Sequence, residues 1–141
     1  MKQLIRKSLT KTVLFAMAVC TVALLGTSGV SHADTLASGA LYGGSNQTVA
    51  VCYIFNAGIR PIAFVSRNIH SQYDGILAIG TRYYDDCGTS LVPGGVCGFS
   101  HTIKNQGYSC KVTIKDSTAT VRGTMEIRDT NNLVLANSEL R

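Results

Sequence analysis

The run Tyr108–Ile114 constrains the fold more than any other stretch, because it alternates apolar and polar residues and carries a cysteine. Cys110 and every second residue after it are apolar, and successive side chains of a β-strand point to opposite faces. A cysteine on the apolar side of such a strand predicts a disulfide across a buried core. Cys52, in the apolar run over residues 48–55, is the natural partner.

Further extended runs separated by turn residues follow one another along the chain. They cover residues 48–56, 62–69, 76–84, 96–103, 119–129 and 133–140. Asp74-Gly75 is typical of a hairpin and Pro93-Gly94 of a type II turn, while residues 34–45 predict a loose start. The pattern therefore predicts an all-β fold, an antiparallel two-layer sandwich of seven or eight short strands, immunoglobulin-like or related.

The first 33 residues have the organisation of a secretory signal peptide. Four basic residues precede a mostly apolar run over residues 13–26, and Ser31-His32-Ala33 offers small residues for cleavage after Ala33. A transmembrane anchor is the alternative, but the run is shorter than the roughly 20 residues that a bilayer requires. We expect residues 1–33 to be removed and residues 34–141 to form a single domain, secreted or held in the cell envelope of a bacterium.

The positive charge of the chain resides largely in that leader. It takes four of the 13 basic residues and none of the eight acidic ones, which leaves nine against eight and a net charge of +1. A nucleic-acid-binding protein needs a basic patch or stripe, which the remaining sequence lacks. We expect no nucleic-acid partner and no stable membrane insertion after the leader is removed.

Four cysteines remain after the leader, an even number in a chain expected to be exported. Cys52, Cys87, Cys97 and Cys110 predict two disulfides, since such bonds persist in oxidising compartments. Three connectivities are open, and we favour the nested one, Cys52 with Cys110 and Cys87 with Cys97. A zinc site is the competing use of four cysteines, but the sequence has no C-x-x-C pair.

Four stretches together resemble a known type of protein. They are V-A-V-C-Y-I-F-N-A-G from Val49, C-G-T-S-L-V-P-G-G-V-C from Cys87, Y-S-C-K-V-T-I from Tyr108 and V-R-G-T-M-E-I-R-D from Val121. The chain is similar to small exported bacterial β-sandwich proteins of unknown function. The resemblance implies an exported sandwich with two disulfides and no catalytic residues.

One spacing resembles a feature of immunoglobulin-like sandwiches. Tyr108 stands two residues before Cys110, as in the tyrosine corner, where the phenol bonds the backbone a few residues upstream. The chain has no tryptophan to pack on the disulfide, as antibody domains do. The resemblance to the immunoglobulin-like class is therefore partial.

Candidate catalytic and metal-binding residues are sparse. A serine hydrolase is hinted at only by Gly98-Phe99-Ser100-His101-Thr102, which lacks the closing glycine of G-x-S-x-G. This stretch also falls inside an expected strand. His70 and His101 are separated in sequence without ligand spacing. We expect no cofactor, no metal and no enzymatic activity.

The segment Tyr83, Tyr84, Asp85 and Asp86 is the candidate interaction loop. Tyrosine is enriched at interfaces and could contact a protein or stack on a sugar, while paired carboxylates could bind calcium. The alternative is a solvated acidic loop anchored by Cys87. We expect an exported, non-enzymatic binding or structural module with a protein or glycan partner. A secreted effector or inhibitor directed at a competitor or host protein is the alternative, motivated by exposed loops such as residues 71–75 and 83–86 on a small disulfide-held scaffold. A small hydrolase comes third.

Overall fold

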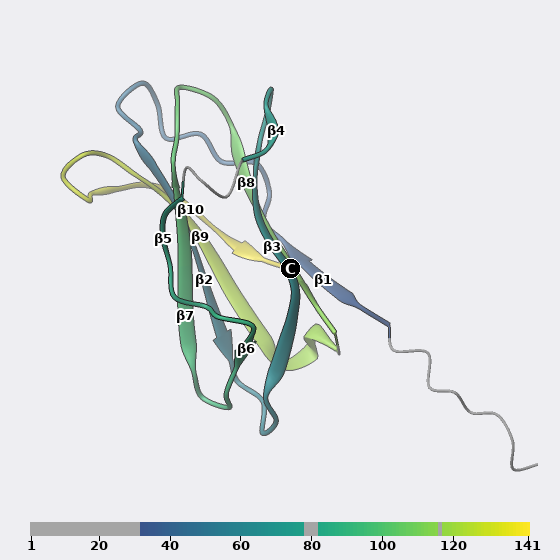
Figure 1. The fold of residues 1–141 in the computed structure, drawn as a ribbon. Helices are drawn as coiled ribbons and strands as arrows, with labels where there is room; N and C mark the ends of the chain where they lie inside the picture. The colour runs from purple at the N-terminus through teal and green to yellow at the C-terminus, as the bar shows by residue number, and fades with distance from the viewer. Residues whose placement is uncertain (1–31, 78–81, 116) are drawn as a thin grey trace, which may run out of the picture. The chain divides into compact units, whose positions relative to one another are not determined.

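The computed structural model describes residues 32–77, 82–115 and 117–141 (Figure 1). This part of the chain contains ten strands and one 3-10 turn, η2. In chain order they are β1 (Asp34–Ala37), β2 (Val49–Asn56), β3 (Ile62–Ser71), β4 (Gly75–Ile76), β5 (Arg82–Asp85), β6 (Ser90–Leu91), β7 (Val96–Thr102), β8 (Tyr108–Ile114), η2 (Thr118–Thr120), β9 (Val121–Arg128) and β10 (Val134–Leu140).

The strands form two antiparallel sheets of five strands each. The first, called sheet A below, has the order β1-β8-β3-β4, and β6 also pairs with β3. The second, sheet B, has the order β10-β9-β2-β7-β5. The prediction of an all-β sandwich is confirmed. The strands outnumber the seven or eight expected because short pieces such as β4 and β6, two residues each, are too brief to show a sequence period.

The core lies between the two sheets and contains the disulfide that joins them. Cys52 on β2 of sheet B bonds Cys110 on β8 of sheet A, and both are fully buried. Cys110, Val112 and Ile114 are all buried, so β8 presents the apolar face that its alternation predicts. The bond links the central strand of one sheet to an inner strand of the other.

A second disulfide joins Cys87, just after β5, to Cys97 on β7. The two bonds form the nested pairing that the spacing favoured. The turn between Leu91 and Val96 has Gly94 at φ 70°, the positive dihedral that a type II turn requires.

Among the described residues, no helix is long and apolar enough to cross a bilayer.

Two segments differ from the sequence expectations. Residues 34–45 were expected to be loose, but residues 34–37 form β1, whose partner β8 lies far along the chain. The expected single strand over residues 76–84 is divided: β4 pairs with β3 in sheet A, and β5 pairs with β7 in sheet B. Residues 78–81 lie outside the described residues. The apolar alternation therefore spans a change of sheet, which a local period cannot reveal.

Candidate ligand-binding cleft

Three loops meet beyond the same ends of the strands, at the top of Figure 1. They connect β1 to β2, β3 to β4, and β7 to β8. Between them lies an open depression of about 550 Å³, called the loop-end cleft below. Its lining residues are Ala40, Leu41, Tyr42, Gln72, Tyr73, Asn105, Gln106 and Gly107.

A buried glutamine joins the first of these loops to the third. Gln47 is only 4% exposed, and its Oε1 accepts a hydrogen bond from the Gly43 N–H at 2.7 Å. Its Nε2 donates to the carbonyl of Gln106 at 2.6 Å and also to the carbonyl of Lys104. Since a buried amide must find partners, this side chain fixes both loops at once.

The second loop is attached to the third by a carboxylate. Gln106 donates from Nε2 to Ser71 Oγ and to Asp74 Oδ2, both at 2.6 Å. The Ser71 hydroxyl also donates to Asp74 Oδ2 at 3.2 Å. The bonds from Gln106 and then Ser71 hold the pKa of the Asp74 carboxyl below its ordinary value of 3.8, because they favour its charged form. The β3–β4 hairpin is thereby fixed against residues 103–107.

The third loop is in turn anchored to the core strand β8. The phenol of Tyr108, itself buried, accepts a hydrogen bond from the Lys104 N–H at 2.8 Å. This is the bond to upstream backbone that a tyrosine corner makes. Leu41 and Tyr108 exchange two backbone hydrogen bonds, of 2.7 and 2.9 Å, so the first loop rests on the same residue. The cleft therefore has a rigid base next to the Cys52–Cys110 bond.

Two tyrosines line the cleft and are largely open to solvent. Tyr73, at the tip of the β3–β4 hairpin, is 75% exposed, and Tyr42 is 55% exposed. The hydroxyl of Tyr42 donates to Asn105 Oδ1 across the cleft. Tyrosine rings give large, rigid contact area at a low entropic cost, which is why paratopes use them.

The remaining lining groups are neutral and polar. None of the residues that line the cleft carries a charged side chain. Asn105 Nδ2, Gln106 Oε1 and Gln72 Nε2 make no hydrogen bond to any residue that the structure describes. The cleft can thus offer amide donors and an amide acceptor to a ligand while its walls keep their own bonds.

The carboxylates of the expected interaction loop make internal contacts. Asp85 pairs with Arg67 of sheet A at 3.1 Å and accepts a hydrogen bond from the Cys87 N–H. Asp86 accepts one from the Gly98 N–H at 2.6 Å. These contacts fasten the segment to both sheets. Nothing is described of the Tyr83 side chain.

Tyr84 lies on the outer surface of sheet B rather than in a loop. Its hydroxyl lies over Gly98 and beside the ring of Tyr53. Burial, and then the neighbouring Tyr53 phenol, raise the pKa of Tyr84 above its ordinary value. Arg128 donates to the Tyr53 hydroxyl at 3.1 Å and to Glu126 at 2.9 Å. We call Tyr53, Tyr84, Glu126 and Arg128 the tyrosine–arginine face.

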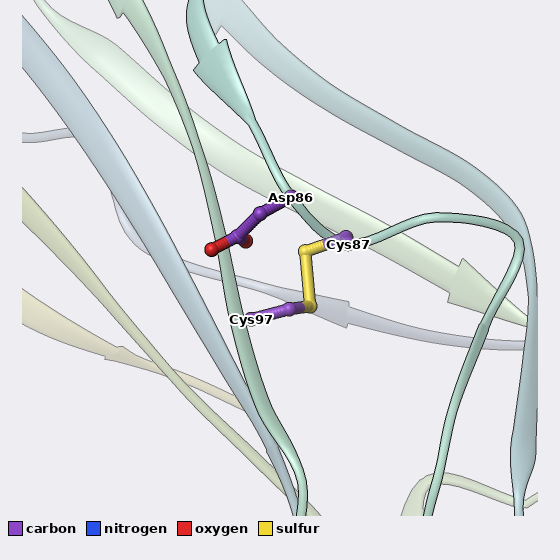
Figure 2. A group of neighbouring side chains, drawn as sticks. All are labelled: Asp86, Cys87 and Cys97. Atoms are coloured by element: carbon purple, nitrogen blue, oxygen red, sulfur yellow. A yellow bond between two sulfur atoms is a disulfide. The ribbon is translucent and has the colours of Figure 1, made fainter.

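One group of potential metal ligands occurs among the described residues, and its chemistry is wrong for a metal. The ligand atoms of Asp86, Cys87 and Cys97 lie within 4.8 Å of one another (Figure 2). Both sulfurs belong to the disulfide, so neither is the thiolate that binds zinc. The Asp86 carboxylate is already bonded to backbone. The group is structural.

The structure separates the serine and the histidines considered for catalysis. Ser100 and His101 are consecutive residues of β7, so their side chains point to opposite faces of sheet B. Both are buried, and Ser100 Oγ accepts a hydrogen bond from the Tyr84 N–H. His70 lies on β3 of sheet A. A nucleophile and a base are not brought together by these residues.

Tyr42 and Asn105 were not singled out from the sequence, whereas Tyr73 lies in the exposed loop over residues 71–75 that motivates the effector alternative. The three residues are distant in the chain, and only the sandwich topology brings their loops together. A local signal existed, because Tyr42 precedes Gly43-Gly44 and Tyr73 sits in the hairpin before Gly75, so both tyrosines fall at turns.

Comparison with protein families and with curated proteins finds no match for this chain.

Proposed function

We propose that residues 34–141 form an exported, non-enzymatic binding module whose ligand occupies the loop-end cleft. The observation that carries the proposal is the pair of solvent-exposed tyrosines, Tyr42 and Tyr73, on a cleft whose walls are held by the hydrogen bonds of Gln47 and Gln106. Binding sites are commonly placed on loops that a rigid scaffold positions. A prearranged cleft lowers the entropic cost of binding.

Export is supported by three observations. The leader has the order of charged, apolar and small residues that a signal peptidase reads. Two disulfides are typical of extracytoplasmic proteins. β1 begins at Asp34, directly after the expected cleavage site, and the Asp34 carboxylate accepts bonds from the N–H and hydroxyl of Thr118. The proposed mature chain therefore starts with a residue that the fold uses.

The tyrosine corner and the disulfide between the sheets support a finer proposal about the class of domain. An inter-sheet disulfide next to a corner tyrosine is the arrangement found in immunoglobulin-like sandwiches. We propose on this ground that the domain is an immunoglobulin-like binding scaffold. By this correspondence the loop-end cleft lies at the corner end of the sandwich, opposite to the B–C and F–G loops that variable domains use for recognition.

The binding function can be tested by substituting the most exposed tyrosine. Extracellular glycans and proteins are passed over immobilised, oxidised protein, over Tyr73→Ala and over Ile59→Ala. Ile59 is 93% exposed and lies between β2 and β3, beyond the end of β2 opposite to the cleft. We expect material retained by the unsubstituted protein and by Ile59→Ala to be lost on Tyr73→Ala. Equal retention by all three, or none by any, would remove the proposal.

A second candidate function is a secreted effector or inhibitor that acts through the tyrosine–arginine face. Tyrosine and arginine are enriched among the residues that dominate protein interfaces. Arg128 is held in place by Glu126 and lies over the Tyr53 ring, with its guanidinium carbon 5.8 Å from the centroid. Retention of one protein that is lost on Arg128→Ala and kept on Tyr73→Ala would favour this candidate over the cleft.

A further inference from the structure

We propose that the ligand of the loop-end cleft is a neutral oligosaccharide, with one sugar ring stacked on Tyr73 and its hydroxyls bonded by the amides of Asn105 and Gln106. The proposal rests on the binding function proposed above and names its ligand class. Three properties of the cleft carry it: the charge of its lining, the placement of its aromatic rings and the groups left open for hydrogen bonding.

The lining excludes strongly charged ligands. Phosphate, sulfate and carboxylate groups are normally held by arginine, lysine or converging backbone N–H groups. The cleft lining contains no cationic and no anionic side chain. The carboxylate of Asp74, which is bonded to the lining residue Gln106, also accepts a hydrogen bond from Ser71. The site is therefore suited to a ligand that is polar but uncharged.

The exposed rings suit a ligand with a flat, weakly polar face. A pyranose ring has such a face, formed by its C–H groups, while its hydroxyls project from the edge. Tyr73 is positioned by a three-residue hairpin loop, in which the N–H groups of Tyr73 and Asp74 donate to Ser71 Oγ at 3.3 and 3.0 Å. The ring therefore stands on ordered backbone and can receive a sugar without a large loss of loop entropy.

The open amide groups match the edge of a sugar ring. A sugar hydroxyl is both a donor and an acceptor, so it is best met by one donor and one acceptor side by side. Asn105 Nδ2 and Gln106 Oε1 supply this combination from consecutive residues. Asn105 is oriented by the bond that its Oδ1 accepts from Tyr42. The bond fixes the oxygen end of the Asn105 amide, and its Nδ2 donor has no hydrogen-bond partner among the described residues.

A peptide fits the same cleft less well. Peptide recognition by extended chains uses a free strand edge, and specificity comes from pockets for side chains. The cleft is lined by loops, and among its lining residues Leu41 is the only one with a large aliphatic side chain. A peptide would gain neither strand pairing nor a deep apolar pocket there.

The test is a binding experiment with defined oligosaccharides. The full 141-residue chain is expressed with export, and the oxidised product is labelled with ¹⁵N and titrated separately with cellotetraose, maltotetraose, mannotetraose and chitotetraose. Trigalacturonate serves as the charged probe and a pool of neutral hexapeptides as the peptide probe. Backbone amide shifts report which residues each probe contacts, and the spectrum itself shows whether a variant is folded.

We expect at least one neutral tetrasaccharide to give saturable shifts centred on residues 72–75 and 105–107. Tyr73→Ala is expected to weaken binding about tenfold or more, as truncation of a central aromatic contact does, while Tyr73→Phe and Ile59→Ala keep it. Shifts of these residues by hexapeptides or trigalacturonate but by no neutral saccharide would overturn the ligand class and leave the binding function standing. Shifts at the cleft by no probe would overturn the ligand class, and the retention experiment with Tyr73→Ala then decides the binding function separately.

Discussion

The Nε2 of Gln47 donates a hydrogen bond of 2.6 Å to the main-chain carbonyl of Gln106, which lies 59 residues further along the chain. Through this bond the loop before β2 is attached to the loop before β8. Gln106 in turn reaches the β3–β4 hairpin with its own side chain. The side chains of Gln47 and Gln106 together therefore connect all three loops that form the cleft, and the consequences can be measured.

Substituting Gln47 with alanine is expected to destabilise the domain. The change removes three hydrogen bonds made by a buried side chain, at a cost of about 2 kcal/mol in the free energy of unfolding. Urea unfolding measures it. Gln72→Ala is the matched control, because Gln72 is exposed and accepts only one bond of 3.3 Å. An equal loss for the two variants would contradict the role of Gln47.

The tyrosine corner makes its own prediction. Tyr108→Phe removes only the hydroxyl that accepts the Lys104 N–H, so the unfolding free energy should fall by about 1–2 kcal/mol with an unchanged dependence on urea concentration. Tyr73→Phe removes a hydroxyl that has no hydrogen bond to any described residue and should change stability by less than about 0.5 kcal/mol. The account of the corner fails if Tyr108→Phe is as stable as the unsubstituted protein.

The two disulfides should differ in their contribution to stability. Cys52 and Cys110 are 58 residues apart in the sequence, whereas Cys87 and Cys97 are only 10 apart. The reduced entropy of the unfolded chain alone therefore gives the first bond a stabilisation of about 4 kcal/mol and the second one of slightly less than about 3 kcal/mol. We expect the double alanine variant of Cys52 and Cys110 to unfold at lower urea than that of Cys87 and Cys97. The first pair also fills the core, which increases the difference. The reverse order would contradict this account.

Acid should release the β3–β4 hairpin. The pKa of Asp74 is lower in the folded state than its ordinary value of 3.8, so its contribution to stability is complete above that value. The contribution declines as the pH falls below 3.8 toward the depressed pKa. Asp74→Asn should be less stable than the unsubstituted protein at neutral pH and lose less stability on acidification. Parallel stability curves between pH 7 and 2.5 would contradict this.

Much of the fold follows from local sequence patterns. Tyr108–Ile114 is a strand with the bounds that its alternation predicts, because one face of β8 is buried against the other sheet. The bend at residues 129–132 has Asn132 at φ 63°, a conformation that asparagine tolerates. A strand with one buried face shows alternating apolar residues, and a turn with a positive φ angle favours asparagine or glycine. Both features can be recognised in the sequence.

The cleft could not be predicted in the same way. Tyr42, Tyr73 and Asn105 are brought together by long-range strand pairing, and nothing in their local sequence encodes that proximity. The same limit explains the missed edge strand β1 and the change of sheet after β4, since both depend on partners distant in the chain. Asp85 and Asp86 looked like surface carboxylates because Arg67 and the Gly98 N–H, their partners, are also distant.

The most direct measurement of the central claim is the affinity of Asn105→Asp for the four neutral tetrasaccharides, by titration calorimetry. Aspartate keeps an oxygen for the Tyr42 hydroxyl but removes the amide donor of this cleft-lining residue. The account predicts that the unsubstituted protein binds at least one of them, and that Asn105→Asp binds it about tenfold more weakly with an unchanged unfolding midpoint. Equal affinity of the two proteins, or no binding by the unsubstituted protein, would contradict it.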